Sequence, residues 1–228
     1  MKEYSIAPSD FAFLYDESKW AFYLKYVGGI KRPPLILPKI FNVIDSSIKE
    51  CYEGQDFSQV CKDLPQGIMK TSDKWVKSIP ITNPDYDVSV SIIGKIDAYF
   101  ELPDGTNSII DFKTSEVKED FAQKYNRQLH AYCYGVTKPA NSNCLKLENL
   151  TNPGLIVFEP SKFMIDYNGR AGIRGKVVWQ SFDLDIDSFR SFISNEVIPL
   201  LAGPEPKPED SDPYWKYLQQ FGFAYEQE

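Results

Sequence analysis

The residues best suited to chemistry are Asp97, Asp111 and Lys113, on two predicted neighbouring strands. Side chains alternate along a strand, so Asp111 and Lys113 share one face while Ile110 and Phe112 point to the other. Pairing of the two strands would bring Asp97 close to Asp111. Because adjacent carboxylates repel, the pattern predicts a hard divalent cation, Mg²⁺ or Mn²⁺, held by Asp97, Asp111 and the main-chain carbonyl of Phe112.

A lysine beside such a cation indicates a site that hydrolyses phosphodiester bonds. The cation polarises the phosphate and lowers the pKa of water, while Lys113 orients that water or stabilises negative charge in the transition state. An alternative interpretation involves no chemistry: Asp97 is solvated, and Asp111 and Lys113 form a surface ion pair that contributes little to stability. The triplet alone leaves both interpretations open.

A β-hairpin is expected to position the two aspartates. Apolar and polar residues alternate over 88–93 and again over 96–102, and the change of phase near Gly94 indicates a bulge or bend. Pro103-Asp104-Gly105 is a turn signal, which makes 108–114 the returning strand.

The helix expected after this hairpin, over 119–135, carries a second group of polar side chains. Tyr125, Gln128 and Tyr132 lie on one helical face by their spacing, and Tyr125 is expected in the core. His130 falls on a different face from Gln128, so we interpret it as a surface or packing residue without a catalytic role.

The whole chain is expected to divide into one α/β domain over 1–202 and an acidic, proline-rich C-terminal arm with a short helix over 203–228. Further helices are predicted over 8–27, 38–52 and 189–201, short strands over 154–159 and 177–182, and a polar loop over 53–72. Gly203 to Pro213 contains four prolines and is predicted to be a linker.

Composition excludes several classes of protein. The chain has 228 residues, of which 43% are hydrophobic and 14% aromatic, enough for a substantial core. No apolar run approaches the roughly 18 residues of a membrane span, so no membrane partner is expected. The opening residues lack the pattern of a secretory signal, and we expect a cytoplasmic protein.

The net charge of -7 argues against a protein that coats nucleic acid by charge alone. However, 203–228 holds six acids and two lysines, whereas 1–202 is nearly neutral. Divalent cations bound at Asp97 and Asp111 would reverse the local sign. Binding of DNA is therefore expected to depend on metal.

Cysteine and histidine give no metal site of the usual kind. The four cysteines form no CxxC pair and His130 is the single histidine, which disfavours a zinc site and a cysteine or serine protease. The cysteines also match no iron-sulfur spacing. We expect reduced thiols, with Cys133 buried on a helix.

Three motifs in this order resemble the RecB-like branch of the PD-(D/E)XK nuclease superfamily: GxID ending at Asp97, hDhK(T/S) containing Asp111 and Lys113, and QxxxY from Gln128 to Tyr132. The resemblance covers about 40 residues, with softer similarity in the first helix. It implies a restriction-endonuclease-like α/β fold, with a central mixed sheet between helices. It also implies a divalent-metal-dependent DNA nuclease, an exonuclease, acting in recombination or repair, with Gln128 and Tyr132 beside the metal.

The chain also departs from this family. Iron-sulfur members carry a cysteine on the first helix where this chain has Ser18-Lys19-Trp20, so no cluster is expected. Many members place a histidine on the second helix as a further metal ligand. Asp45 is the closest candidate here, although it can equally be a solvated residue that pairs with Lys49.

A nuclease would bind DNA and could depend on a helicase, a recombination protein or self-association, because the chain is weakly basic.

Two other functions stay open. The chain could be a non-catalytic nucleic-acid or protein-binding module that retains the fold. It could also be a metal-dependent phosphohydrolase that acts on small substrates.

Overall fold

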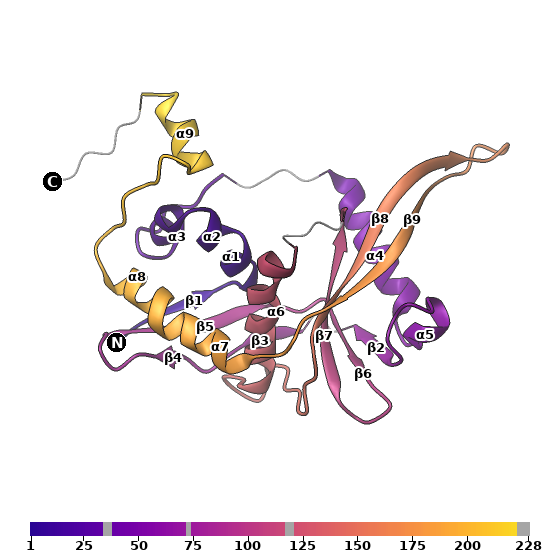
Figure 1. Ribbon diagram of the computed structural model, residues 1–228, viewed down its shortest axis with the longest axis horizontal. Helices are drawn as coiled ribbons and strands as arrows, with labels where there is room; N and C mark the ends of the chain where they lie inside the picture. Colours follow the sequence, from indigo (N-terminus) through magenta and orange to yellow (C-terminus); the bar gives the residue numbers. More distant parts are fainter. Residues whose placement is uncertain (34–37, 72–73, 117–120, 223–228) are drawn as a thin grey trace.

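Two mixed β-sheets with helices on their faces form the architecture of the chain (Figure 1). The structure is a computed structural model that describes residues 1–33, 38–71, 74–116 and 121–222. The predicted mixed α/β class is confirmed, with two sheets in place of one central sheet. None of the helices in these ranges has the length and apolar character needed to cross a membrane.

The first sheet is built around β5 (Val88–Lys95). β1 (Lys2–Ile6) lies parallel to β5, whereas β3 (Trp75–Lys77) and β4 (Ile81–Thr82) pair with it antiparallel. Ile92 of β5 is fully buried, in a core that this sheet shares with the surrounding helices.

The second sheet has the order β2-β6-β7-β8-β9. Its strands are β2 (Ile68–Thr71), β6 (Ala98–Glu101), β7 (Asn107–Thr114), β8 (Gly154–Ile165) and β9 (Ala171–Ser181). β7 and β8 are parallel and the other neighbours antiparallel. Gly105 takes φ 80° in the β6–β7 turn, a conformation that favours glycine, and the predicted hairpin is confirmed. β7 is therefore hydrogen-bonded on both edges.

The chain passes from one sheet to the other at Ile96 and Asp97, between β5 and β6. The predicted bend near Gly94 is wrong by two residues, because β5 continues to Lys95. Ile96 is buried in the core beneath α6 (Phe121–Thr137), which holds the crossing against the second sheet.

The helices surround both sheets. They are α1 (Pro8–Ala12), α2 (Leu14–Glu17), α3 (Lys19–Tyr26), α4 (Lys39–Tyr52), α5 (Phe57–Val60), α6, α7 (Ile186–Phe192), α8 (Ile198–Ala202) and α9 (Pro213–Gln219), with a π-helical turn η1 (Ile193–Val197) joining α7 to α8. The helix predicted over 8–27 is thus three short helices. Ser18 has an extended backbone that ends α2, and its hydroxyl accepts the Ala21 N–H at 3.0 Å to begin α3.

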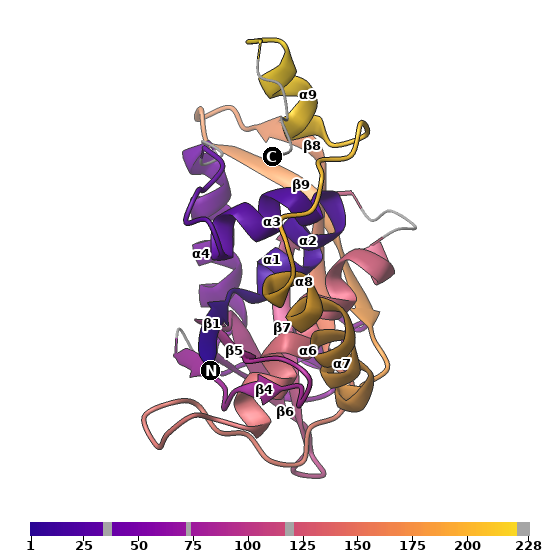
Figure 2. The same ribbon diagram turned by 90° about the vertical axis from the view of Figure 1, so that its left-hand side faces the viewer.

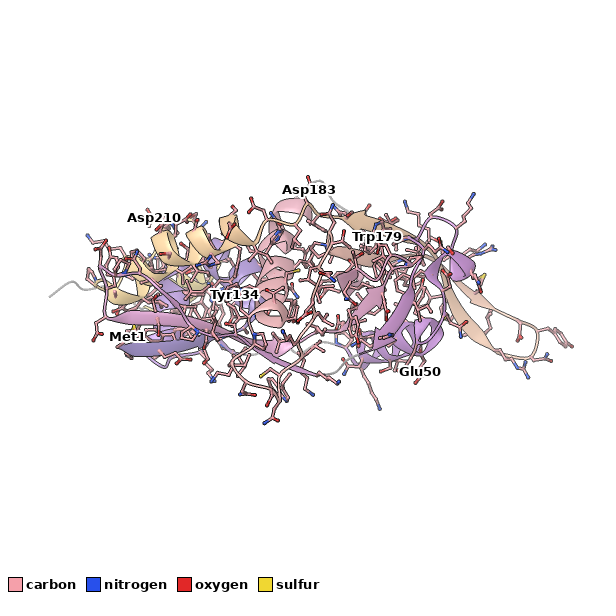
Figure 3. All side chains as sticks on the ribbon, turned by 90° about the horizontal axis from the view of Figure 1, so that it is seen from below. Met1, Glu50, Tyr134, Trp179, Asp183 and Asp210 are labelled. Carbon is pink, nitrogen blue, oxygen red and sulfur yellow. The ribbon has the colours of Figure 1, made fainter. Side chains whose placement is uncertain are left out.

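α6 and α4 cover opposite faces of the second sheet. Ile109 of β7 packs beneath α6, whereas Ile110 and Phe112 pack with Tyr52 of α4. Figure 3 shows the two sides, with Glu50 of α4 on one and Asp183, just before α7, on the other. β7 is therefore the strand whose two faces meet two different helices.

Two predictions about flanking segments are wrong. The supposed polar loop over 53–72 contains α5 and β2, and Phe57 and Met69 there are fully buried. The strands predicted over 154–159 and 177–182 are only the inner ends of β8 and β9, which continue as a long hairpin. Short elements and an exposed hairpin both give weak apolar periodicity.

The C-terminal arm folds back on the N-terminal helices, and α9 lies beyond α3 in Figures 1 and 2. Asp212 is buried and forms the centre of this contact, which we call the Asp212 cluster. Its Oδ2 accepts from the Ser18 hydroxyl, and its Oδ1 lies 3.4 Å from Arg32 and accepts from the N–H of Trp215 at 3.1 Å. Trp215 packs edge-on against Trp20, with ring centroids 5.6 Å apart, and both rings are buried in this contact.

Candidate active site

Asp111 lies in the middle of the second sheet, and only 3% of the residue is exposed. Its Oδ1 accepts a hydrogen bond from Nε2 of Gln128 at 3.0 Å, and its Oδ2 forms an ion pair with the Lys113 ammonium. Ile110 and Phe112 point to the α4 side. The predicted alternation along this strand is confirmed, and because Asp111 is buried and Lys113 only partly exposed, the two do not form a fully solvated surface ion pair.

Burial raises the pKa of Asp111 to about 6, against the opposing effect of the Lys113 charge, and the Asp97 carboxylate raises it further. For Lys113, burial acts to lower the pKa, yet the Asp111 carboxylate outweighs it and the net pKa is raised. Burial therefore disfavours the charged form of both groups, and each charge is stabilised by the other. Asp111 is the group whose charged form is disfavoured overall, so a second positive charge nearby would stabilise it.

Asp97 lies at the crossing between the two sheets and reaches the same point from the neighbouring strand. Ala98 pairs with Ile110, so continuation of this register puts Asp97 beside Asp111. Oδ2 of Asp97 accepts the main-chain N–H of Phe112 at 3.2 Å. The structure therefore brings the two predicted carboxylates together. The Phe112 carbonyl as a ligand stays a prediction.

Lys49 of α4 is a member of this site that the sequence did not indicate. Its Nζ lies 3.0 Å from Oδ1 of Asp97 and 3.0 Å from Oδ2 of Asp45. Burial acts to lower the pKa of Lys49, but Asp97 and Asp45 outweigh it and the net pKa is raised. Asp45 thus forms the i, i+4 pair that its spacing allowed, and one ammonium group connects it to Asp97.

α6 supplies the polar and aromatic side chains above β7. Gln128 and Tyr132 are buried beside Asp111, and burial together with the charges of Asp111 and Asp97 raises the pKa of Tyr132. Tyr125 is in the core, as expected, and the Lys113 ammonium lies 5.0 Å from its ring centroid. The helix therefore shields Asp111 from water, whereas Asp97 stays partly exposed, and the Tyr132 hydroxyl is neutral.

The oxygens of this site fit a divalent cation. Oε1 of Gln128 is buried and accepts no hydrogen bond within the described residues, and Oδ2 of Asp111 has its ion pair but no well-directed hydrogen bond. The described part of the chain contains no group of three or more histidine, cysteine, aspartate or glutamate side chains placed for a metal. Two carboxylates still suffice for Mg²⁺, which takes its other ligands from water and substrate phosphate. A cation at Asp97 would compete with Lys49.

His130 and the cysteines take no part in this site. Nδ1 of His130 donates to the carbonyl of Asn126 at 2.8 Å, and Nε2 accepts the N–H of Asp185 at 2.9 Å. The interpretation of His130 as a packing residue is therefore supported, because it joins α6 to the start of α7. Cys133 is buried in α6, and burial raises the pKa of its thiol.

The bases near α6 are mostly engaged with the protein. Arg127 forms an ion pair with Asp16 and covers the ring of Phe192, with its guanidinium 4.1 Å from the centroid. Lys124 lies 5.7 Å from the ring centroid of Phe13. Lys118, a third base of this segment, lies outside the described residues.

Comparisons with known proteins identify no family. No protein-family model matches the sequence, and no curated protein matches it. A solved structure entitled "Crystal structure of SSO0001" aligns over 85% of this chain and 75% of its own, at 12% identity and a TM-score of 0.43. That likeness is too distant to assign a fold or a function.

Proposed function

We propose that the chain is a divalent-metal-dependent DNA nuclease with a restriction-endonuclease-like fold, of the RecB-like branch of the PD-(D/E)XK superfamily. One observation carries the proposal: buried Asp111 contacts both Lys113 and Gln128 and lies beside Asp97. Three motifs that resemble that family thus converge on one carboxylate. The same resemblance favours exonucleolytic action in recombination or repair.

The residues of the site have distinct tasks in phosphodiester hydrolysis. Mg²⁺ or Mn²⁺, when bound, supplies positive charge that polarises the phosphate and acidifies water. Asp97 and Asp111 hold the cation, and Gln128 fixes the orientation of Asp111 through its hydrogen bond. The Lys113 ammonium orients the attacking water or offsets negative charge that develops on the phosphate. Tyr132 presents a neutral hydroxyl beside the carboxylates.

The test is cleavage of linear and circular, single- and double-stranded DNA in Mg²⁺, Mn²⁺ or EDTA. We expect activity only with metal, and a loss of at least about 100-fold in Asp111→Asn and Lys113→Gln, because the first removes a ligand charge and the second an ammonium group. Cleavage of circular substrates would separate an endonuclease from an exonuclease.

A matched control uses another acid–base pair of the same sheet. Lys70 of β2 and Glu101 of β6 form an exposed ion pair, so Lys70→Gln and Glu101→Gln should leave cleavage unchanged. Circular dichroism of every variant separates loss of chemistry from loss of folding. Cleavage in EDTA, or full activity in both site variants, would exclude the proposed mechanism.

A second candidate is a binding module that retains the fold without catalysis. It is favoured by the two lysines, since Lys49 already pairs with Asp97 and Lys113 with Asp111. In that case the acids would serve a structural ion-pair network. DNA binding without cleavage under every metal condition would support this candidate over the nuclease.

A further inference from the structure

The β8–β9 hairpin extends beyond the helices at one end of the molecule (Figures 1 and 3). Every residue from 160 to 174 is exposed, and the described helices leave both faces of the hairpin uncovered there. The exposed side chains include large apolar ones, with Phe163 67% and Ile165 68% exposed. An extension of this length that buries so little has no evident role in holding the fold together.

Strand pairing sorts the side chains of the hairpin onto two faces. Lys162 lies opposite Arg174, and Phe163 lies opposite Ile173. Residues directly opposed in an antiparallel pair project to the same side, and successive residues alternate. One face therefore carries bases, while the other carries Phe163 and Ile173.

The basic face continues the face of the candidate active site. Along β9, Val178 belongs to the core beneath α6, whereas Trp179 packs on the α4 side. Steps of two from Val178 lead to Lys176 and Arg174, so these bases share the α6 side of the sheet. Asp111 and Lys113 lie on that same side. We call Lys162, Arg174 and Lys176 the basic hairpin face.

Charge distinguishes this hairpin from the rest of the chain. Residues 159–177 hold four bases and two acids, whereas the whole chain has a net charge of -7. Lys176 pairs with Glu159 at 2.7 Å, but neither Lys162 nor Arg174 forms an ion pair with any described residue. A surface hollow of about 750 Å³ at the base of the hairpin is lined by Glu116, Glu159, Arg174 and Lys176. Glu116 follows β7, so the hollow connects the strand of Lys113 with the hairpin.

We propose that the basic hairpin face binds the phosphate backbone of duplex DNA beside the cleavage site. Its position relative to DNA rests on the proposed function. Lys113 lies opposite Val157 of β8, and Lys162 follows five residues later. At roughly 3.3 Å per strand residue this is about 16 Å, or roughly five base-pair steps of 3.4 Å. The hairpin would therefore contact the duplex about five base pairs from the cleaved bond, and its apolar face would point away from the DNA.

The test is binding of a fluorescently labelled 30-base-pair duplex across 50 to 200 mM salt, in EDTA and again in Mg²⁺ with all chains in the cleavage-deficient Lys113→Gln background. Loss of two phosphate contacts in Lys162→Gln/Arg174→Gln should reduce the salt slope by roughly 1.8. The affinity advantage of the native chain over this variant should then shrink about tenfold across that salt range. Cleavage of the same duplex in Mg²⁺ is measured in parallel.

Two controls separate local contacts from general effects. Lys138→Gln/Lys207→Gln changes the net charge equally at exposed positions outside the hairpin and should leave affinity and slope unchanged. Phe163→Ser/Ile173→Thr alters the other face of the same hairpin and should also bind normally. Equal affinity and slope for the native chain and Lys162→Gln/Arg174→Gln would overturn the inference.

The failures of the two proposals are distinguishable. DNA cleavage that is indifferent to the hairpin bases would overturn the inference and leave the nuclease standing. Hairpin-dependent binding without cleavage would reject the nuclease and support the binding face. Vesicles with 30% phosphatidylserine provide a last arm: hairpin-dependent binding to vesicles, with DNA binding unaffected, would assign this face to an anionic membrane surface instead.

Discussion

Gln128 of α6 donates a 3.0 Å hydrogen bond to Asp111 in the middle strand of the second sheet. Both side chains are buried, with 4% of Gln128 and 3% of Asp111 exposed. The bond therefore connects α6 to β7. It also fixes Oδ1 of Asp111, so that Oδ2 faces the Lys113 ammonium.

Gln128→Leu should lower both stability and activity. In EDTA at pH 7.5 the free energy of unfolding should fall by about 2 kcal/mol, because hydrogen bonds to charged groups contribute roughly 1.5–3 kcal/mol. DNA cleavage should fall by about 10- to 100-fold, as for other residues that orient a ligand. In Asp111→Asn/Gln128→Leu the two stability effects should not add. Additivity within about 0.5 kcal/mol would mean that the residues act independently.

The pKa of Asp111 predicts how stability depends on pH in EDTA. Its pKa is about 6 in the folded chain and about 3.9 when unfolded, so the folded state binds the proton more tightly. The contribution of Asp111 therefore falls as pH rises from about 4 to 6, by up to about 3 kcal/mol. Urea unfolding of the native chain and Asp111→Asn measures this difference. A difference constant across pH 4–7 would contradict the raised pKa.

Lys49 should compete with a divalent cation at Asp97. Lys49→Gln removes an ammonium group 3.0 Å from Oδ1 of Asp97, so Mn²⁺ should bind about tenfold more tightly, a change of about 1.4 kcal/mol. Isothermal titration calorimetry gives the affinity. Lys39→Gln, with the same charge change at an exposed position of the same helix, should alter it less than twofold. Weaker Mn²⁺ binding in Lys49→Gln would show that Lys49 supports the metal position.

The Asp212 cluster should contribute to stability without affecting chemistry. Asp212→Ala removes the cap of α9 and leaves Ser18 and Arg32 without their buried partner, so unfolding free energy should fall by about 3 kcal/mol. Asp210→Ala, at an exposed position on the same arm, should have almost no effect. DNA cleavage at a temperature where both variants are folded should stay within twofold of the native chain. A selective loss of cleavage in Asp212→Ala would connect the arm to the site.

Local periodicity was sufficient to predict which side chains share a face within one element. Alternation along a strand indicated that Asp111 and Lys113 share a face, and the structure pairs them. Helical spacing put Gln128 and Tyr132 on one face of α6, whereas their expected place beside the carboxylates came from the family resemblance and depends on the contact between α6 and β7. The hairpin turn at Gly105 was predictable because it too depends on neighbouring residues.

Contacts between distant segments were not predictable in this way. Lys49 and Asp97 are 48 positions apart, and no periodicity connects α4 to the crossing between the sheets. That crossing depends on the burial of Ile96 beneath α6, a tertiary contact. The full length of the outer hairpin was not predicted, because residues near Phe163 are apolar yet exposed, which breaks the pattern of a half-buried strand.

The contact between Ser18 and Asp212 joins positions separated by 194 residues. During synthesis the first helices leave the ribosome long before their partner exists, and Trp20 stays uncovered until Trp215 follows. Long-range closure of this kind is slow, and it exposes apolar surface in the incomplete chain. The N-terminal helices therefore reach their final packing only once translation has passed Trp215, almost 200 residues after Trp20.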